Sequence, residues 1–257
     1  MNQHSTDLIA EHIEGGIRTI SLLNGKAHPL SSSMIAALHN ALHRAKDDPE
    51  TRVLVIEGAG HIFCAGHDLK EIARHRTDPD QGRAFLTELF DACGAMMLTL
   101  AQLPKPTIAM VDGIATAAGL QLAASCDLRF VSPRATFCLP GVNNGGFCTT
   151  PAVGVSRAIA RTHVMELALS GEALDAKWAL RAGLATRVIP SESLAAETRA
   201  FAEKLSSRNP GPIARGKTTL DAHLPLSLEE AYALATPVMV EHFMDEGRLQ
   251  REASKLY

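Results

Sequence analysis

Two loops of small residues are the parts of this sequence with the clearest chemical use. Residues 58–71 follow a short apolar strand at 52–57, and residues 111–119 follow a second apolar run and open a predicted helix. Small side chains leave backbone N–H groups uncovered, and such groups can stabilise negative charge that develops on a carbonyl oxygen. Two loops about fifty residues apart therefore predict an oxyanion hole with two donors.

Other kinds of chemistry have weaker support in the sequence. The eleven histidines are scattered, and the five cysteines (Cys64, Cys93, Cys126, Cys138 and Cys148) include no Cys-x-x-Cys pair. This spacing predicts no metal site, and it favours free thiols in a reducing compartment. Gly58-x-Gly60 lacks the third glycine and the following helix of a dinucleotide-binding loop.

Composition limits the location and the partners that we expect. The net charge is −3, so neither nucleic acid nor an anionic membrane is expected as the main partner. The first seven residues lack a basic segment followed by an apolar one, and no uninterrupted apolar run reaches the length that spans a membrane. These observations predict a cytoplasmic protein.

The elements that would position the two loops alternate in the front half of the chain. We expect two strands within residues 8–23 around a turn at 14–16, and then a helix that starts at the serines Ser31-Ser32-Ser33 and runs to about residue 46. The following elements are a strand at 52–57, a helix at 82–103, a strand at 107–111, a helix at 117–125, and strands at 127–131 and 135–138. The long helix at 82–103 carries apolar residues at three- and four-residue spacing, Phe90 among them, and its pair Met96-Met97 is expected in the core.

The back of the chain is mostly helical. From about residue 157 onward we expect helices at 175–182, 191–207 and 228–245. This order predicts an α/β core at 1–207 and a helical region at 208–257. Residues 208–212 contain two prolines and a glycine and are the best candidate for a hinge between the two parts.

Several motifs, in their order and spacing, resemble the crotonase (enoyl-CoA hydratase/isomerase) superfamily over nearly the whole chain. They are Lys26-Ala27 and the segments 63–71, 105–109, 111–127, 182–190 and 216–217. The resemblance implies a spiral of ββα repeats and C-terminal helices that associate as trimers or as dimers of trimers. It also implies an acyl-coenzyme A thioester as substrate, without a covalently bound cofactor or a metal.

The resemblance also implies site residues. The two backbone donors would be His67 and Ala118, beside Gly66 and Gly119. The positions that would line the adenine and phosphates of coenzyme A are Lys26, Ala27, Ala65, Leu69 and Lys70. Asp68 follows the first donor and suits a helix cap, and Asn143 suits either a substrate contact or a tight turn.

The chain departs from the family where hydratases carry two glutamates. Gln121 stands at the first of these positions and Gly141 at the second, and residues 142–151 contain no carboxylate. A neutral amide can orient water but cannot act as a base near neutral pH. The sequence therefore predicts that the enolate-stabilising half of the site is present and that the usual proton-transfer half is missing.

Three functions remain open at this stage. The first is an enoyl-CoA hydratase/isomerase-like enzyme with weak or atypical hydratase activity. The second is a decarboxylase or thioester hydrolase, in which the His67 ring could hold a carboxylate or move a proton and Cys148 could act as a nucleophile. The third is an acyl-CoA-binding protein without catalytic activity. For His67 the simpler alternative is that only its backbone N–H matters.

Overall fold

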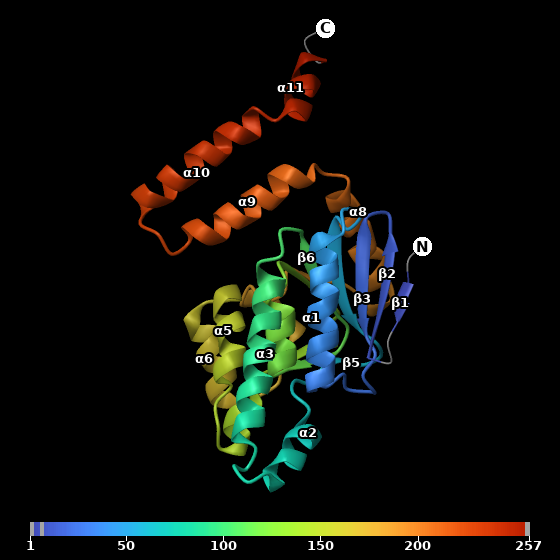
Figure 1. Cartoon of the computed structure of the whole chain (residues 1–257), viewed down its shortest axis with the longest axis vertical. Coiled ribbons are helices and arrows are strands. Elements are labelled where there is room, and N and C mark those ends of the chain that lie inside the picture. Colours follow the sequence, from blue (N-terminus) through green and yellow to red (C-terminus); the bar gives the residue numbers. More distant parts are fainter. Residues whose placement is uncertain (1–2, 6–7, 255–257) are drawn as a thin grey trace. The chain divides into compact units, whose positions relative to one another are not determined.

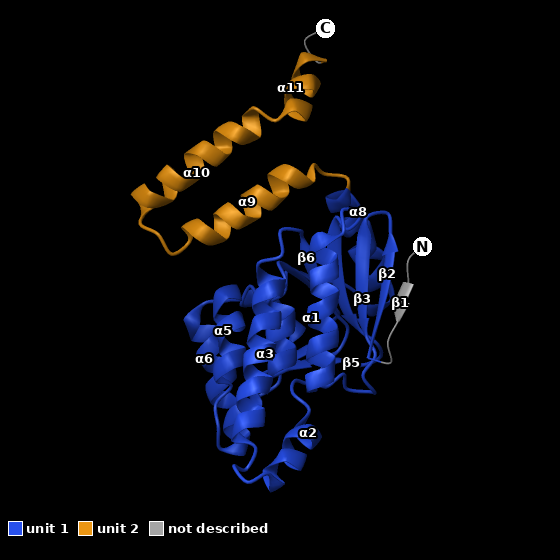
Figure 2. Cartoon of the chain, in the orientation of Figure 1, with its two compact units in different colours: residues 1–206 blue, residues 207–257 orange. Residues whose placement is uncertain are grey.

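The computed structural model describes residues 3–5 and 8–254. The chain divides into two compact units, residues 1–206 and residues 207–257, which Figure 2 shows in different colours. The sequence analysis drew this boundary between residues 207 and 208. The roles assigned to the two parts, acyl-CoA binding and trimerisation, stay predictions.

The first unit is built on a seven-stranded sheet. Its order is β1 (Gln3–Ser5), β2 (Ile9–Glu14), β3 (Ile17–Leu22), β4 (Val53–Gly58), β6 (Thr107–Val111), β8 (Leu128–Val131) and β11 (Arg187–Val188). The pairs β1–β2 and β2–β3 are antiparallel, and the pairs from β3 to β11 are parallel. The expected hairpin turn is present, with Gly15 and Gly16 at φ angles of +60° and +80°, which glycine adopts without steric cost.

A second, smaller sheet has the order β10 (Leu174–Asp175), β9 (Thr136–Cys138), β7 (Ile114–Thr116) and β5 (Ile62–Cys64). Along the chain, β4, β6 and β8 of the large sheet are each followed by β5, β7 and β9 of the small sheet, and each pair then leads into helices. This alternation is the expected ββα repeat. The sequence analysis missed β5 and β7, which have only three residues each.

Helices cover both faces of the large sheet (Figure 1). On one face α1 (Ser32–Asp47) and α3 (Arg83–Ala101) pack against each other and against side chains such as Leu54 and Ile56. On the other face α8 (Ser191–Ser206) packs against Val53 and Val55. Adjacent residues of β4 thus point into different cores, as the pleat of a strand requires.

Helix α3 confirms the prediction for its methionine pair. Met96 and Met97 are buried in the core, as expected, whereas Phe90 is 38% exposed. Among the described helices, α3 alone is long and apolar enough to cross a membrane by length and composition. Its inner side, including Leu89 and Leu100, lies in the main core cluster, and a core helix passes the same test.

The rest of the first unit consists of short helices. They are α2 (Leu69–Arg74), α4 (Ala118–Ala124), α5 (Thr149–Ala158), α6 (Arg161–Ser170) and α7 (Ala176–Arg181), with 3₁₀ turns η1 (His75–Thr77) and η2 (Pro140–Asn144). Helices α2 and α4 begin at the ends of the two glycine-containing loops. These loops are therefore the starting points of helices, as the second one was expected to be.

The second unit contains α9 (Pro210–His223), α10 (Leu228–Phe243) and α11 (Glu246–Ala253). The hinge predicted at 208–212 is wrong in part, because Pro210 is the first residue of α9 and the Asn209 side chain accepts a hydrogen bond from the N–H of Gly211. Proline suits the first turn of a helix, because the N–H groups there have no acceptor within the helix and the lack of one costs nothing. Helix α10 starts with the reciprocal hydrogen bonds of a capping box, Ser227 with Glu230.

Candidate active site

The backbone around His67 is fixed by a neighbouring segment. The N–H of Leu30 donates to the carbonyl of Gly66 over 2.8 Å, and the N–H of Asp68 donates to the carbonyl of Leu30 over 3.2 Å. These two bonds form a parallel bridge between Leu30 and His67. In such a bridge the N–H of the central residue points away from the partner strand, so the His67 N–H faces the opposite side.

Ala118 lies at the start of a helix. It is the first residue of α4, and the first N–H groups of a helix have no acceptor within the helix. The preceding Ala117 has φ +51° and ψ −123°, a conformation that a non-glycine residue rarely adopts and that is typical of functional sites. The strained residue turns the chain from β7 into α4, and the orphan N–H of Ala118 follows directly.

The two loops are in direct contact through glycines. A Cβ atom added to Gly66 would lie 3.2 Å from the backbone nitrogen of Ala118, and one added to Gly119 would lie 2.0 Å from the carbonyl oxygen of Cys64. Gly66 also has φ +85°. A larger residue is excluded at Gly119 unless the backbone moves and is strained at Gly66, and the close approach brings the two predicted donors to one place.

The predicted coenzyme A residues lie along the same edge. The N–H of Ala65 donates to the carbonyl of Ala27 over 2.9 Å, which places Lys26 and Ala27 beside the first loop. Leu69 is 72% exposed, and it is followed by the exposed Lys70 in the first turn of α2. The structure thus brings an apolar side chain and two cations to the surface beside the loop.

Asp68 has a structural role in the described structure. Its side chain accepts hydrogen bonds from the N–H groups of Lys70 and Glu71, at 2.9 and 3.2 Å. Its position is the N-cap of α2, where a carboxylate satisfies orphan N–H groups and is favoured by the helix dipole.

Two buried polar atoms near the loops lack partners. Within residues 3–5 and 8–254, neither Oε1 of Gln121 nor Nε2 of His67 has a hydrogen-bond partner. Gln121 is 5% exposed and lies one turn after Ala118 in α4. Burial lowers the pKa of His67, which keeps its ring neutral near pH 7, and the ring lies edge-on against Phe90 with centroids 5.1 Å apart. An unpaired buried polar group costs about 1–3 kcal/mol, so both atoms are available to a ligand or to water.

The second hydratase position is closed by backbone. A Cβ atom on Gly141 would lie 2.7 Å from the nitrogen of Cys148 and 2.8 Å from the carbonyl carbon of Phe147. A glutamate at 141 could therefore not be accommodated unless the loop at 147–148 moved. The sequence showed that a carboxylate is missing here, and the structure adds that the space for its side chain is missing too.

Asn143 uses its amide within the protein. Its Nδ2 donates to the carbonyl of Gly171 over 2.9 Å, and Gly171 ends helix α6 with φ +63°. A substrate contact by Asn143 stays a prediction, but its observed contact is with the end of α6.

The cysteines are free thiols in the structure. Burial raises the pKa of Cys148, whose Sγ accepts the N–H of Gly141 over 3.3 Å, and burial raises the pKa of Cys64 to about 12. A cysteine nucleophile requires a lowered pKa or an adjacent base, so Cys148 lacks the first of these features. In the described ranges no group of three or more His, Cys, Asp or Glu side chains could hold a metal.

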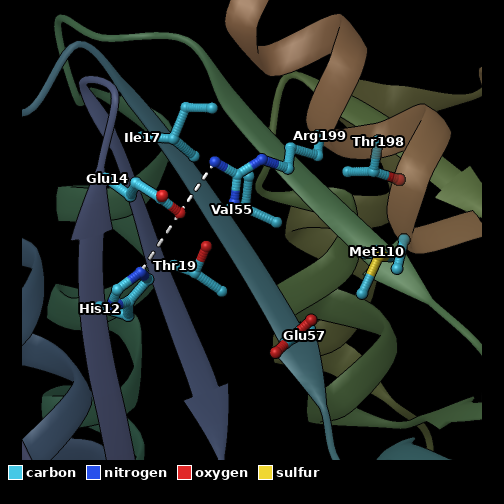
Figure 3. A pocket seen from close by; sticks show the side chains of 10 residues that line it. His12, Glu14, Ile17, Thr19, Val55, Glu57, Met110, Thr198 and Arg199 are labelled. Carbon is cyan, nitrogen blue, oxygen red and sulfur yellow. Dashed lines mark ion pairs between the residues drawn. The ribbon is translucent and has the colours of Figure 1, made fainter.

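Two cavities of the first unit were missed by sequence reasoning. One, of about 340 Å³, lies along α3 and its lining includes Arg76, Arg83 and Phe90. The other, of about 90 Å³, lies on the α8 side of the large sheet (Figure 3). In this second cavity Glu14 pairs with Arg199 over 2.8 Å and with His12 over 3.6 Å, so its charges are satisfied internally. The helical spacing of Phe90 provided no signal of the first cavity, because spacing does not show that this side chain is exposed.

Fold and loop geometry define a class: an α/β protein of ββα repeats in which two backbone segments meet at a pair of potential oxyanion donors. Residues 12–255 match the enoyl-CoA hydratase/isomerase family. The chain belongs to this family.

Individual relatives agree with this assignment. The chain is 41% identical over 242 residues to mouse enoyl-CoA hydratase domain-containing protein 3, mitochondrial, covering 93% of this chain and 79% of the mouse protein. It is 33% identical to carnitinyl-CoA dehydratase of Proteus mirabilis, over 89% of this chain and 86% of that protein. The resemblance to the crotonase family is thus confirmed. Within the family, the segments 115–122, 140–143 and 147–151 of the sequence resemble the domain-containing protein 3 subgroup, and the mouse relative belongs to that subgroup by name.

Solved structures support the same fold. An enoyl-CoA hydratase/isomerase family protein from Silicibacter pomeroyi is 60% identical, with a TM-score of 0.89 over 93% of this chain and 99% of its own. Human enoyl coenzyme A hydratase domain-containing protein 3 is 36% identical, with a TM-score of 0.90 over 97% of both chains. The predicted fold, an α/β spiral of ββα repeats with a helical C-terminal region, is confirmed.

The comparisons correct one prediction. The mouse, rat, frog and human relatives are all named mitochondrial, which contradicts the cytoplasmic location expected from the sequence. That expectation was based on the N-terminal residues and the free cysteines. These features do not distinguish the cytoplasm from a mitochondrial compartment that is also reducing.

Proposed function

We propose that this chain is an acyl-CoA-processing enzyme, a lyase or isomerase of the enoyl-CoA hydratase kind, that stabilises a thioester enolate with the N–H groups of His67 and Ala118. The observation that carries the proposal is the contact of Gly66 with the nitrogen of Ala118, where a Cβ would lie only 3.2 Å away. Removing one donor of an oxyanion hole typically costs about 3–4 kcal/mol of transition-state stabilisation.

Coenzyme A would bind beside the first loop. In this proposal the backbone of Ala27 and Ala65 and the exposed Leu69 face the adenine and the pantetheine, and Lys26 and Lys70 face the phosphates. The hydrogen bond between Ala65 and Ala27 supports this arrangement because it holds both segments together. The thioester is the substrate, and no covalently bound cofactor is part of the proposal.

Conventional hydration would be weak. Gln121 is buried with an unpaired Oε1 and can orient a water molecule but not deprotonate it. Gly141 offers neither a carboxylate nor space for one. The enzyme would therefore stabilise an enolate while lacking the two groups with which hydratases of the family activate water.

A second candidate is decarboxylation or hydrolysis of a CoA thioester. Loss of carbon dioxide from a malonyl-type thioester leaves an enolate directly, so the oxyanion hole serves it without a base at Gln121 or Gly141. The unpaired and buried Nε2 of His67 supports this candidate, since a neutral imidazole can hydrogen-bond a substrate carboxylate. An acyl-CoA-binding role without turnover is the third candidate.

The second unit supports a proposal of self-association, as a trimer or a dimer of trimers. Its helices expose many large apolar side chains: Leu220, Leu224, Leu226, Leu228, Tyr232, Leu234, Met239, Val240, Phe243, Met244 and Leu249. Exposed large apolar side chains in such number are typical of interaction sites. Sedimentation of the purified protein would give the assembly state.

One experiment tests these candidates together. The purified protein is mixed with crotonyl-CoA, a longer enoyl-CoA, methylmalonyl-CoA and a saturated acyl-CoA, and binding, loss of the enoyl absorbance, carbon dioxide and free CoA are followed. We expect binding with little hydration. Fast hydration that is lost in Gln121→Ala would contradict the proposed weak hydratase, and failure of every thioester to bind would contradict the acyl-CoA proposal as a whole.

A further inference from the structure

A cavity of about 340 Å³ lies along helix α3, and one of its lining residues, Phe90, contacts the ring of His67. Arg83, Leu86, Thr87 and Phe90 line it from one face of α3, and Arg76, Asp80 and Gln81 line it from the turn before the helix. Spacings of three, four and seven residues place side chains on the same face of a helix. Phe90 is the link to the loops, because its ring contacts the ring of His67 at a centroid distance of 5.1 Å.

The far end of this cavity is positively charged. In the part of the chain that the structure describes, the guanidinium of Arg83 has no ion pair or hydrogen bond. The guanidinium of Arg76 donates one bond, from Nη1 to the carbonyl of Gln81 over 2.9 Å, and keeps further N–H groups for a ligand.

The acid in the cavity is already satisfied. Asp80 accepts hydrogen bonds from the N–H groups of Gly82 and Ala84, at 2.9 and 2.8 Å, and these bonds hold its pKa below the ordinary range. The negative charge of Asp80 therefore interacts with the N–H groups at the start of α3. The two arginines remain the groups that could bind an anion in the cavity.

The two ends of the cavity differ in chemistry. Phe90 and Leu86 are apolar and lie between the His67 ring and Arg83 in the order of the helix. Seven residues separate Phe90 from Arg83, which corresponds to about 10 Å at a rise of 1.5 Å per residue. Along the helix the order is therefore Phe90, whose ring contacts His67 of the proposed site, then the apolar Leu86 and then the cationic Arg83.

We propose, on the basis of the proposed function, that this cavity receives the acyl chain and that Arg83 and Arg76 bind a carboxylate at its distal end. The substrate class is thus the CoA thioesters of dicarboxylic acids of medium length. Guanidinium groups suit this role because their planar donor arrangement matches the two oxygens of a carboxylate. Leu86 and Phe90 contact the methylene groups between the two ends.

The anion could have another source, since coenzyme A carries phosphates. The apolar pair Phe90 and Leu86 favours the acyl carboxylate, because a chain that leaves the proposed oxyanion donors past the His67 ring would meet Phe90 and Leu86 before the arginines. A phosphate of coenzyme A would make no use of this pair. The two sources predict different responses to the same substitutions.

The test compares suberyl-CoA with octanoyl-CoA, two thioesters of equal chain length that differ in the distal carboxylate. Affinities are measured by titration calorimetry for the full chain and for Arg83→Gln, Arg76→Gln and the control Arg74→Gln, whose exposed side chain is outside the cavity lining. The exposed positions of Arg76 and Arg83 make folded variants the expectation, and circular dichroism checks it.

We expect the unaltered protein to bind suberyl-CoA at least about tenfold more tightly than octanoyl-CoA, as charge-assisted hydrogen bonds allow. Arg83→Gln and Arg76→Gln should remove most of this preference without changing the affinity for octanoyl-CoA, and Arg74→Gln should keep it.

Equal affinities in the unaltered protein would overturn the inference and leave the acyl-CoA proposal standing. Equal weakening of both thioesters by Arg83→Gln would also overturn it, because the arginine would then bind coenzyme A itself. If neither thioester binds, the proposed function and the inference both fail.

Discussion

The loops around His67 and Ala118 differ from the positions of Gln121 and Gly141 in what the chemistry requires of them. At the loops the proposed working groups are backbone N–H donors, and the bridge to Leu30, the start of α4 and two close glycine contacts hold their backbone in place. At the other two positions the working groups would be side chains. One of these side chains is an amide whose Oε1 has no hydrogen-bond partner among the described residues, and the other is absent.

This difference explains how one half of a site is kept while the other changes. Backbone donors depend on the path of the chain, which many core contacts determine together, so they persist as long as the fold does. An acid or base depends on one side chain and is lost by one substitution. Family membership therefore supports the proposed oxyanion hole far more strongly than it supports any particular proton transfer.

The largest expected effect comes from Gly119→Ala, which adds a Cβ 2.0 Å from the carbonyl oxygen of Cys64. Backbone must move to relieve the overlap, and we expect a loss of more than about 3 kcal/mol in the free energy of unfolding, at the upper end of the cost of overpacking. Urea denaturation measures it.

Gly94→Ala is the matched control for this substitution. Gly94 is exposed in α3 and has nothing within 4 Å of an added Cβ, so alanine should raise stability by about 0.5–1 kcal/mol. If the two variants were equally stable, the loops would not be packed as closely as the account requires.

A smaller effect is expected from Gly66→Ala. The added Cβ would lie 3.0–3.2 Å from Ala117 and Ala118, at a residue with φ +85°. The fold should survive with a loss of about 1–2 kcal/mol, but the two donors would be pushed apart. We expect the turnover of any substrate to fall by at least about tenfold. This is less than the fall expected when one donor is lost entirely. Unchanged turnover at steady state would show that the donors lie elsewhere.

Gln121→Leu lies in the proton-transfer half of the proposed site, and it should change stability and turnover in opposite directions. Its Oε1 is buried without a partner among the described residues, and an unpaired polar group costs about 1–3 kcal/mol. We expect the leucine variant to be more stable by about 1 kcal/mol in thermal unfolding and to have lower turnover. A destabilised variant would mean that the amide makes a structural hydrogen bond, through water for example.

The smallest effect is expected from His67→Gln, which keeps the backbone donor and removes the ring. Burial lowers the pKa of His67, so below its ordinary pKa of about 6.5 the unfolded chain binds a proton that the folded chain resists. Stability is therefore unaffected above pH 6.5 and falls as the pH drops below it.

In His67→Gln the loss of stability between pH 7 and pH 5 should be smaller than in the unaltered protein, as measured by denaturation at each pH. His61→Gln, at an exposed position of the same loop, is the control and should not change the profile. Binding of a saturated acyl-CoA should survive His67→Gln. Loss of that binding would show that the ring, and not only the backbone, contacts the substrate.

The sequence predicted the elements whose signals are local. The start of α1 followed from Ser31, whose side chain accepts the N–H of Met34, and from apolar residues at helical spacing. It did not predict β5 and β7, because strands of three residues are stabilised by pairing with each other and with β9, which are distant in sequence.

The same limit applies to the site, where features that depend on contacts between distant residues could not be predicted. That Gln121 and Gly141 replace carboxylates can be read from residue types, but the closure of Gly141 by the backbone of Phe147 and Cys148 depends on a loop conformation. Phe90 belongs to the apolar pattern of α3, and periodicity does not say which part of an apolar face extends beyond the core. The cavity beside it was therefore not predictable from the sequence.

The central claim is that the chain stabilises an enolate without the usual acid and base. Binding of acetoacetyl-CoA tests it most directly, because this thioester ionises to an enolate by itself and needs no base from the protein. We predict that the enolate absorbance increases on binding at neutral pH, that Gly66→Ala reduces this increase, and that crotonyl-CoA is hydrated slowly or not at all in the same preparation. Bound acetoacetyl-CoA without an increase in enolate absorbance, or rapid hydration of crotonyl-CoA, would contradict the account.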